Sequence, residues 1–156
     1  MADDAVCRKI LEFIPQQKPF RFVDEILEAN NSKVVAAYRF RHEEWFYPGH
    51  FPGNPLTPGV ILIETMAQAG LAVMAIYIQL EQGLEESEIR GKNLLFATAD
   101  NVEFFSPVKP GDRVIVNATK IYFKRGTLKS HVEARNENGT LVCTGVLTGK
   151  EVSKNG

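Results

Sequence analysis

The sequence contains little cysteine and no excess of charge of either sign. Two cysteines, Cys7 and Cys143, are too few for a disulfide framework and lack the spacing of metal ligands. The formal net charge is −1, so a polyanion such as nucleic acid is not an expected partner. The first residues, MADDAVCRKILEF, begin with acids and lack the basic-then-apolar order of a secretory signal. These features predict a reduced, cytoplasmic enzyme or binding domain.

Several catalytic motifs are also missing. The chain has no G-x-S-x-G nucleophile elbow, no G-x-G-x-x-G or Walker loop, no H-E-x-x-H and no C-x-x-C pair. Their absence argues against serine hydrolases, nucleotide-dependent enzymes and zinc enzymes. We therefore expect neither a cofactor nor a metal.

One long hydrophobic run raises the question of a membrane span. Residues 60–80 are mostly apolar and could cross a bilayer by length. The run contains Glu64 and Gln68, and a carboxyl group inside a membrane costs about 2.5–3.5 kcal/mol on insertion scales. No basic cluster flanks the run closely. We therefore expect a helix buried in a soluble core, and no membrane span.

The rest of the chain has the composition and patterning of an ordinary globular protein. Hydrophobic residues make up 44% and charged residues 24%, without repeats or linkers. A single domain over residues 1–156 is expected, with a polar tail from about residue 151. Apolar periodicity and turn residues predict a short helix at 7–13, a long helix at 58–82, and strands at 20–27, 33–40, 93–106, 113–123, 127–135 and 140–148.

Consecutive hairpins among these strands favour a largely antiparallel sheet. The long helix is apolar nearly all round, so other elements must cover most of its surface. The fold class expected is α+β, with a curved antiparallel sheet wrapped around one long central helix.

Most of the candidate chemistry lies between His50 and Gln68, in HFPGNPLTPGVILIETMAQ. Histidine and glutamate are well suited to move protons near neutral pH, and burial shifts their pKa values toward that range. Glu64 and Gln68 are four residues apart, so both project from one helix face and can hydrogen-bond each other. The residues alone leave a structural explanation open. Glu64 and Gln68 could satisfy each other at a packing seam, and His50 could be an ordinary structural histidine.

The start of the long helix is a second candidate feature. Thr57 is the expected N-cap and Pro58 the expected first helical residue. The backbone N–H groups near Gly59 and Val60 then lack partners within the helix and lie at the positive end of its dipole. An acyl carbonyl placed there would be polarised as in an oxyanion hole, which suits chemistry beside a thioester. Alternatively, this segment is only a helix start.

The run GHFPGNPLTPGVILIETMAQAG, residues 49–70, resembles the 3-hydroxyacyl-[acyl carrier protein] dehydratases of fatty-acid synthesis, the FabZ type with a hotdog fold. IPQQKPFRFVDEILE at 14–28 and VEFFSPVKPGD at 102–112 support the resemblance. It implies dehydration of a (3R)-3-hydroxyacyl group on acyl carrier protein to the trans-2-enoyl product. It also implies a homodimer whose active sites are shared between protomers, or a hexamer built from such dimers.

The resemblance also implies roles for individual residues. His50 corresponds to the catalytic histidine of the HFPG motif, and Glu64 to the catalytic glutamate of the central helix. The amide of Gly59 binds the thioester carbonyl, and Gln68 orients the glutamate. Val60 and Phe51 are further substrate-binding candidates. The related dehydratase–isomerase branch has aspartate where Glu64 stands, so the chain is similar to the simple dehydratases.

One segment departs from the family pattern. Many members have PHRYPF where this chain has PQQKPF, at residues 15–20, which leaves a specialised lipid, aryl-polyene or polyketide-like pathway open. An apolar substrate tunnel is expected, with wall candidates Phe51, Ile61, Phe96 and Phe105. Two other functions also remain open: another hotdog thioester enzyme (a thioesterase or an isomerase), and a non-catalytic acyl-binding subunit of a heteromeric dehydratase.

Overall fold

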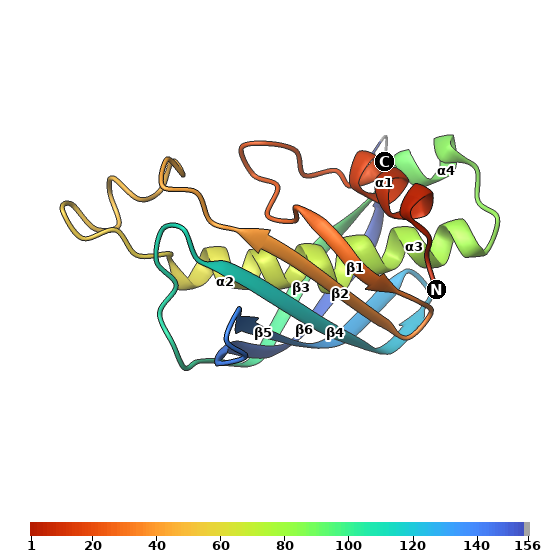
Figure 1. Ribbon diagram of the computed structural model, residues 1–156. Helices are drawn as coiled ribbons and strands as arrows, with labels where there is room; N and C mark the ends of the chain where they lie inside the picture. Colours follow the sequence, from red (N-terminus) through yellow and green to blue (C-terminus); the bar gives the residue numbers. More distant parts are fainter. Residues whose placement is uncertain (155–156) are drawn as a thin grey trace.

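The computed structural model describes residues 1–154, and its centre is one long helix partly enclosed by a curved sheet (Figure 1). Six antiparallel strands form the sheet in the order β1-β2-β4-β5-β6-β3. Their bounds are β1 Glu25–Ala29, β2 Lys33–Arg39, β3 Lys92–Phe104, β4 Arg113–Lys124, β5 Thr127–Asn136 and β6 Leu141–Ser153. The predicted α+β architecture is confirmed.

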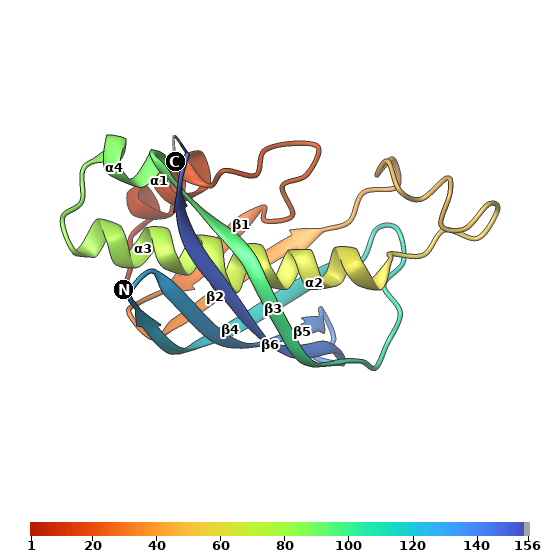
Figure 2. The ribbon, with the colours of Figure 1, turned by 180° about the vertical axis from the view of Figure 1, so that it is seen from behind.

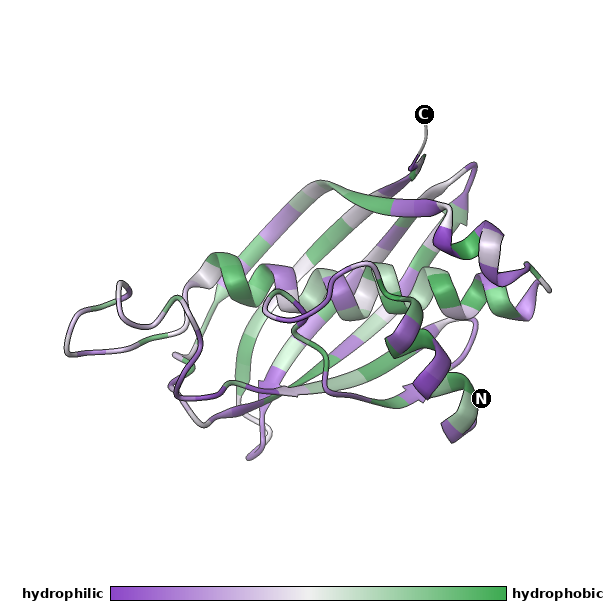
Figure 3. Ribbon diagram, turned by 90° about the horizontal axis from the view of Figure 1, so that it is seen from above, coloured by the Kyte–Doolittle hydropathy of each residue, from purple (hydrophilic) through white to green (hydrophobic). Residues whose placement is uncertain are grey.

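The central helix changes its winding along its length. It begins as α2 Gly59–Ala67, continues as the π-helical segment η1 Gln68–Val73, and ends as α3 Met74–Glu81. The helix is coloured as hydrophobic along most of its course, and it runs along the inside of the curved sheet (Figure 3). The helix is long and apolar enough to cross a membrane, but 78% of its apolar 18-residue stretch is buried within the protein. It is therefore the core helix that the sequence predicted.

The sheet approaches the π-helical segment closely at Gly70. A Cβ atom added to Gly70 would lie 2.7 Å from Cγ2 of Val132, so only glycine fits without a shift. Beside it, the Ser130 hydroxyl donates a 2.8 Å hydrogen bond to the Gly70 carbonyl oxygen. Leu128, Val132 and Ala134 lie on the same buried face of β5 and alternate along it with less buried residues. These contacts fix the position of the helix against the sheet.

The two ends of the central helix differ. Helices α1 Asp4–Phe13 and α4 Glu86–Arg90 lie beside its C-terminal end (Figure 2). Helix α4 was not predicted, although Glu85 and Glu88 form a capping box at its start. At the opposite end, the loop of residues 41–58 projects beyond the sheet (Figure 1). The candidate histidine is on this projecting loop.

Several predicted boundaries were wrong, and helix α1 begins at Asp4 rather than at residue 7. The strand expected at 20–27 begins only at Glu25, because the backbone N–H of Phe22 donates to the Gln68 side chain instead of to a neighbouring strand. The polar tail expected from about residue 151 begins later, because β6 continues to Ser153, which pairs with Lys92 of β3. Residues 155 and 156 of that tail lie outside the described residues.

Candidate active site

Gln68 holds the carboxyl group of Glu64 from one turn further along the central helix. Its Nε2 donates to Glu64 Oε1 at 3.0 Å and to the Phe20 carbonyl oxygen at 2.8 Å. Its Oε1 accepts from the Phe22 backbone N–H at 2.7 Å. A backbone N–H can only donate and a carbonyl can only accept, so these two contacts determine which end of the amide carries nitrogen. The donor end of Gln68 therefore faces Glu64.

The surroundings of Glu64 favour its neutral form. Burial raises the pKa of Glu64, and the hydrogen bond from Gln68 partly offsets this by lowering it. The net result is a pKa above the usual glutamate value. Such a carboxyl keeps its proton to higher pH than an exposed glutamate does, as a general acid requires.

Glu64 and Gln68 lie on the wall of a narrow pocket of about 40 Å³. The remaining wall is mostly apolar and consists of Gln16, Ala67, Leu71, Ala72, Leu94 and Phe96. Phe96 thus lies where a tunnel-wall residue was expected. Gln16 is the one polar addition, and it belongs to the segment that departs from the family pattern.

The imidazole of His50 is held in a defined orientation by its own loop. Its Nδ1 lies 2.7 Å from the Leu56 carbonyl oxygen, and the Leu56 N–H donates to the His50 carbonyl at 2.8 Å. A carbonyl oxygen can only accept, so Nδ1 carries the proton and Nε2 presents a lone pair when the ring is neutral. The Phe51 ring stacks on the imidazole, with ring centroids 3.9 Å apart. The loop therefore presents Nε2 as a proton acceptor.

Gly59 is the first residue of α2, and its N–H is among the helix amides without a partner one turn earlier. The predicted cap is corrected: Pro58 occupies the N-cap position, and the Thr57 hydroxyl pairs with the Tyr47 hydroxyl at 2.6 Å instead. A Cβ atom on Gly59 would lie 2.9 Å from the ring of Phe104. The Phe104 ring of β3 therefore packs closely against Gly59.

A second, more open pocket of about 400 Å³ lies beside Gly59. Its wall also contains Leu56, Thr57, Leu62, Phe104, Phe105, Ser106, Pro107 and Val108. Leu56 connects this pocket to His50, because its carbonyl oxygen holds the imidazole. Phe105, another predicted tunnel residue, is also on this wall.

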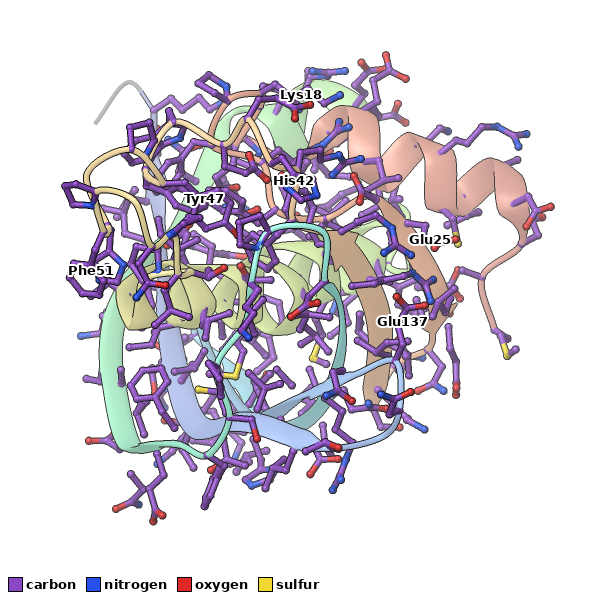
Figure 4. The ribbon with its side chains drawn as sticks, turned by 60° about the vertical axis from the view of Figure 1, so that its left-hand side comes forward. Lys18, Glu25, His42, Tyr47, Phe51 and Glu137 are labelled. Atoms are coloured by element: carbon purple, nitrogen blue, oxygen red, sulfur yellow. The ribbon has the colours of Figure 1, made fainter. Side chains whose placement is uncertain are left out.

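The two pockets have no described residue in common. We call His50, Leu56 and Gly59 the histidine half-site, and Glu64 with Gln68 the glutamate half-site. Tyr47 and Phe51 lie on the loop that projects past the start of the central helix, on the histidine side (Figure 4). Within residues 1–154 of one chain, each half-site is built, but the two are not joined in one pocket.

Three further residues predicted at the site line neither half-site pocket. Val60 is 72% exposed and lines neither half-site pocket. Only its backbone lies near Gly59. Ile61 is buried in the hydrophobic core and lines neither of these pockets, so its predicted place on a tunnel wall is not met in this chain. Phe51 stacks on His50 and lines neither pocket.

Sequence reasoning missed the groups that hold the catalytic candidates. Phe20 and Phe22 bind Gln68 through their backbones across 48 and 46 residues of chain, and Leu56 binds His50 through its carbonyl. Backbone contacts leave no residue-type signal, so no pattern in the sequence could have identified them.

Comparison with known proteins gives one consistent family. The FabA-like domain matches residues 14–145. A 3-hydroxyacyl-[acyl-carrier-protein] dehydratase FabZ from Syntrophobacter fumaroxidans is 40% identical over 127 residues, covering 81% of this chain and 80% of that protein. The FabZ dehydratase of Lawsonia intracellularis is 36% identical over 148 residues, covering 94% of this chain and 92% of that protein.

Solved structures agree on the fold. The dehydratase heterocomplex ApeI:P from Xenorhabdus doucetiae matches with a TM-score of 0.79 at 16% identity, over 94% of this chain and 92% of that one. A hypothetical thioesterase with coenzyme A from Streptococcus pneumoniae matches with a TM-score of 0.56 at 13% identity, over 83% and 85% of the two chains. At these identities the likeness concerns the hotdog fold alone. The sequence matches go further, and the chain belongs to the FabZ-type 3-hydroxyacyl-[acyl-carrier-protein] dehydratases of the FabA-like family.

Proposed function

We propose that this chain removes water from a (3R)-3-hydroxyacyl thioester on acyl carrier protein and releases the trans-2-enoyl thioester. We further propose that it does so in the cytoplasm as a single hotdog domain, residues 1–156. The observation that carries the proposal is the Glu64 carboxyl, whose pKa is raised by burial and which the amide of Gln68 holds at a mostly apolar pocket. Membership of the FabZ-type dehydratases supports the same reaction.

Three groups share the work in this mechanism. The Gly59 N–H polarises the thioester carbonyl, which acidifies the proton on C2. His50 Nε2 takes that proton, since Nδ1–H is committed to the Leu56 carbonyl. Glu64 gives its proton to the 3-hydroxyl group, which leaves as water. The C2–H and C3–O bonds break, and the C2–C3 double bond forms.

The half-sites suggest how two chains complete the active site. Strand β3 lies at the edge of the sheet, and Phe96 and Phe104 on it are large, apolar and exposed. Phe96 lines the glutamate half-site, whereas Phe104 lines the pocket of the histidine half-site. A two-fold axis near the middle of β3 would bring the Phe96 end of one strand beside the Phe104 end of its partner. A homodimer paired in this way joins Glu64 of one protomer to His50 of the other.

The proposal is tested by following the ultraviolet absorbance of the enoyl thioester with purified protein and 3-hydroxyacyl-acyl carrier protein. His50→Ala and Glu64→Gln should each lower kcat by about 10²- to 10⁴-fold, the usual worth of one proton-transfer group. His131→Ala is the matched control, because His131 is exposed on β5 outside both half-sites. Circular dichroism and sedimentation check that the variants remain folded and dimeric.

Two outcomes would overturn the proposal. Release of free thiol without the enoyl product would make the protein a thioesterase. Binding of the acyl thioester without any turnover would make it a non-catalytic acyl-binding subunit.

A further inference from the structure

A second small cavity continues from the glutamate half-site along the central helix. It occupies about 20 Å³ and shares Gln16, Ala72 and Leu94 with the pocket of Glu64. The rest of its wall consists of Phe13, Pro15, Ala75, Ile76, Gln79, Ile89, Lys92, Asn93 and Glu151. The three shared wall residues place this cavity next to the pocket of Glu64, and we call the two together the acyl route. It points from the reacting carboxyl toward the end of the molecule where α1 and α4 lie (Figure 2).

The far part of this route contains two residues whose buried side-chain oxygens have no partner among the described residues. Gln16 Oε1 and Asn93 Oδ1 are both shielded from solvent, and neither has a hydrogen-bond partner among residues 1–154. Buried acceptors are nearly always paired, because an unpaired one loses its hydration without compensation. Both residues line the same cavity, so these two oxygens can accept from a hydrogen-bond donor that enters it.

Two of the neighbouring polar side chains are engaged with each other, because Gln79 Nε2 donates to Glu151 Oε1 at 2.7 Å. Lys92 Nζ lies 4.0 Å from the other Glu151 oxygen, and its side chain is 42% exposed. Glu151 is itself an acceptor when ionised. A molecule that enters the cavity can therefore supply the donor that the two oxygens accept.

The distance along the helix suits the far end of an acyl chain. Ala75 lies 75 − 64 = 11 residues after Glu64, which corresponds to at most roughly 16 Å at the α-helical rise, because the π-helical segment between them is shorter per residue. A thioester reacting at Glu64 would extend its acyl tail along this route. Gln16, moreover, belongs to the run Gln16-Gln17-Lys18, in which this chain departs from the PHRYPF pattern.

We propose that the far end of this acyl route, marked by Gln16 and Asn93, selects 3-hydroxyacyl thioesters that carry a second hydroxyl group at the distal end of the chain. This inference rests on the proposed dehydratase function and names its substrate class. A distal hydroxyl can donate to one amide oxygen. It can also accept from the other amide if that group turns over to present its NH₂. A plain hydrocarbon end would bury both oxygens unpaired.

The test compares pairs of 3-hydroxyacyl-acyl carrier proteins with equal carbon number, with and without the distal hydroxyl. The wild type should show a kcat/KM about tenfold higher for the hydroxylated member of the best-fitting pair, equivalent to about 1.4 kcal/mol at 25 °C. Gln16→Met and Asn93→Leu should each remove most of this preference, and the double variant should reverse it. Gln17→Met is the matched control, because the Gln17 side chain donates to the Ile14 carbonyl and lines neither cavity.

Equal kcat/KM values for both members in the wild type would overturn the inference and leave the dehydratase function standing. That result would mean that a resident water satisfies the two oxygens. If neither member is dehydrated, the proposed function fails instead. Calorimetric binding of the matching saturated acyl thioesters to the wild type and to Gln16→Met then decides the inference. Tighter binding of the hydroxylated thioester, lost in Gln16→Met, supports it, and equal binding overturns it.

Discussion

Replacing Gln68 with leucine should damage both stability and catalysis, because one amide serves both. The substitution keeps a side chain of similar size but removes three hydrogen bonds, to the Phe22 N–H, the Phe20 carbonyl and Glu64 Oε1. Phe22 is buried, so its N–H would stay unpaired. Phe20 is partly exposed, so its carbonyl can be rehydrated at lower cost.

The magnitude follows from these three contacts. An unpaired buried N–H costs about 1–3 kcal/mol, and each of the other bonds contributes about 0.5–1.5 kcal/mol. The free energy of unfolding should therefore fall by roughly 2–6 kcal/mol, toward the lower end because the Phe20 carbonyl can be rehydrated. At the same time, the pKa of Glu64 should rise further, because the hydrogen bond that lowers it is gone. The alkaline limb of the kcat–pH profile should move to higher pH.

The assay combines urea unfolding with a pH profile of enoyl formation. Ser130→Ala is the control, because it removes one buried hydrogen bond to Gly70 in the same helical segment without touching Glu64. The control should lose about 1 kcal/mol of stability and keep the wild-type pH profile. If Gln68→Leu matches the control in both stability and pH profile, Gln68 does not hold Glu64 in the way described.

Three further predictions concern pH, packing and assembly. Burial raises the pKa of Glu64 in the folded state, so wild-type stability should fall as pH rises from the unfolded to the folded pKa. Glu64→Gln should therefore gain in Tm relative to wild type across that window and show no such trend below it. Gly70→Ala should cost about 1–3 kcal/mol in urea unfolding, because its Cβ would meet Val132, whereas Gly49→Ala, with open space around it, should cost little. Leu95→Glu places a charge on the exposed face of edge strand β3, and sedimentation should show monomers with reduced turnover. An active Leu95→Glu monomer would contradict the shared site.

The fold could largely be predicted from apolar patterning. The β5 alternation, with Leu128, Val132 and Ala134 inward, has a period of two that only a strand satisfies. The core helix was identifiable because a long apolar run with an internal carboxyl fits a wrapped helix better than a bilayer. Its π-helical segment left no signal in the apolar pattern, and the contacts of Gly70 with Val132 and Ser130, about 60 residues away in sequence, appear only in the folded chain.

The HFPG motif and the spacing of Glu64 and Gln68 identified the candidate groups, and the family resemblance implied active sites shared between protomers. The residues themselves gave no signal for the two half-sites. The separation of His50 from Glu64 within one chain depends on how the loop of residues 41–58 projects. Likewise, Asn93 gave no signal, since its relevance depends on its place beside Gln16 in the folded chain.

The most direct test of the shared active site mixes two inactive chains. His50→Ala and Glu64→Gln, carrying different affinity tags, are co-expressed, and the mixed dimer is isolated by two successive purifications. One of its two sites then pairs an intact Glu64 with the partner's intact histidine, so turnover should recover to about half of the wild-type value per dimer. A mixed dimer as inactive as either parent variant would show that each chain must supply both groups itself, and the account would fail.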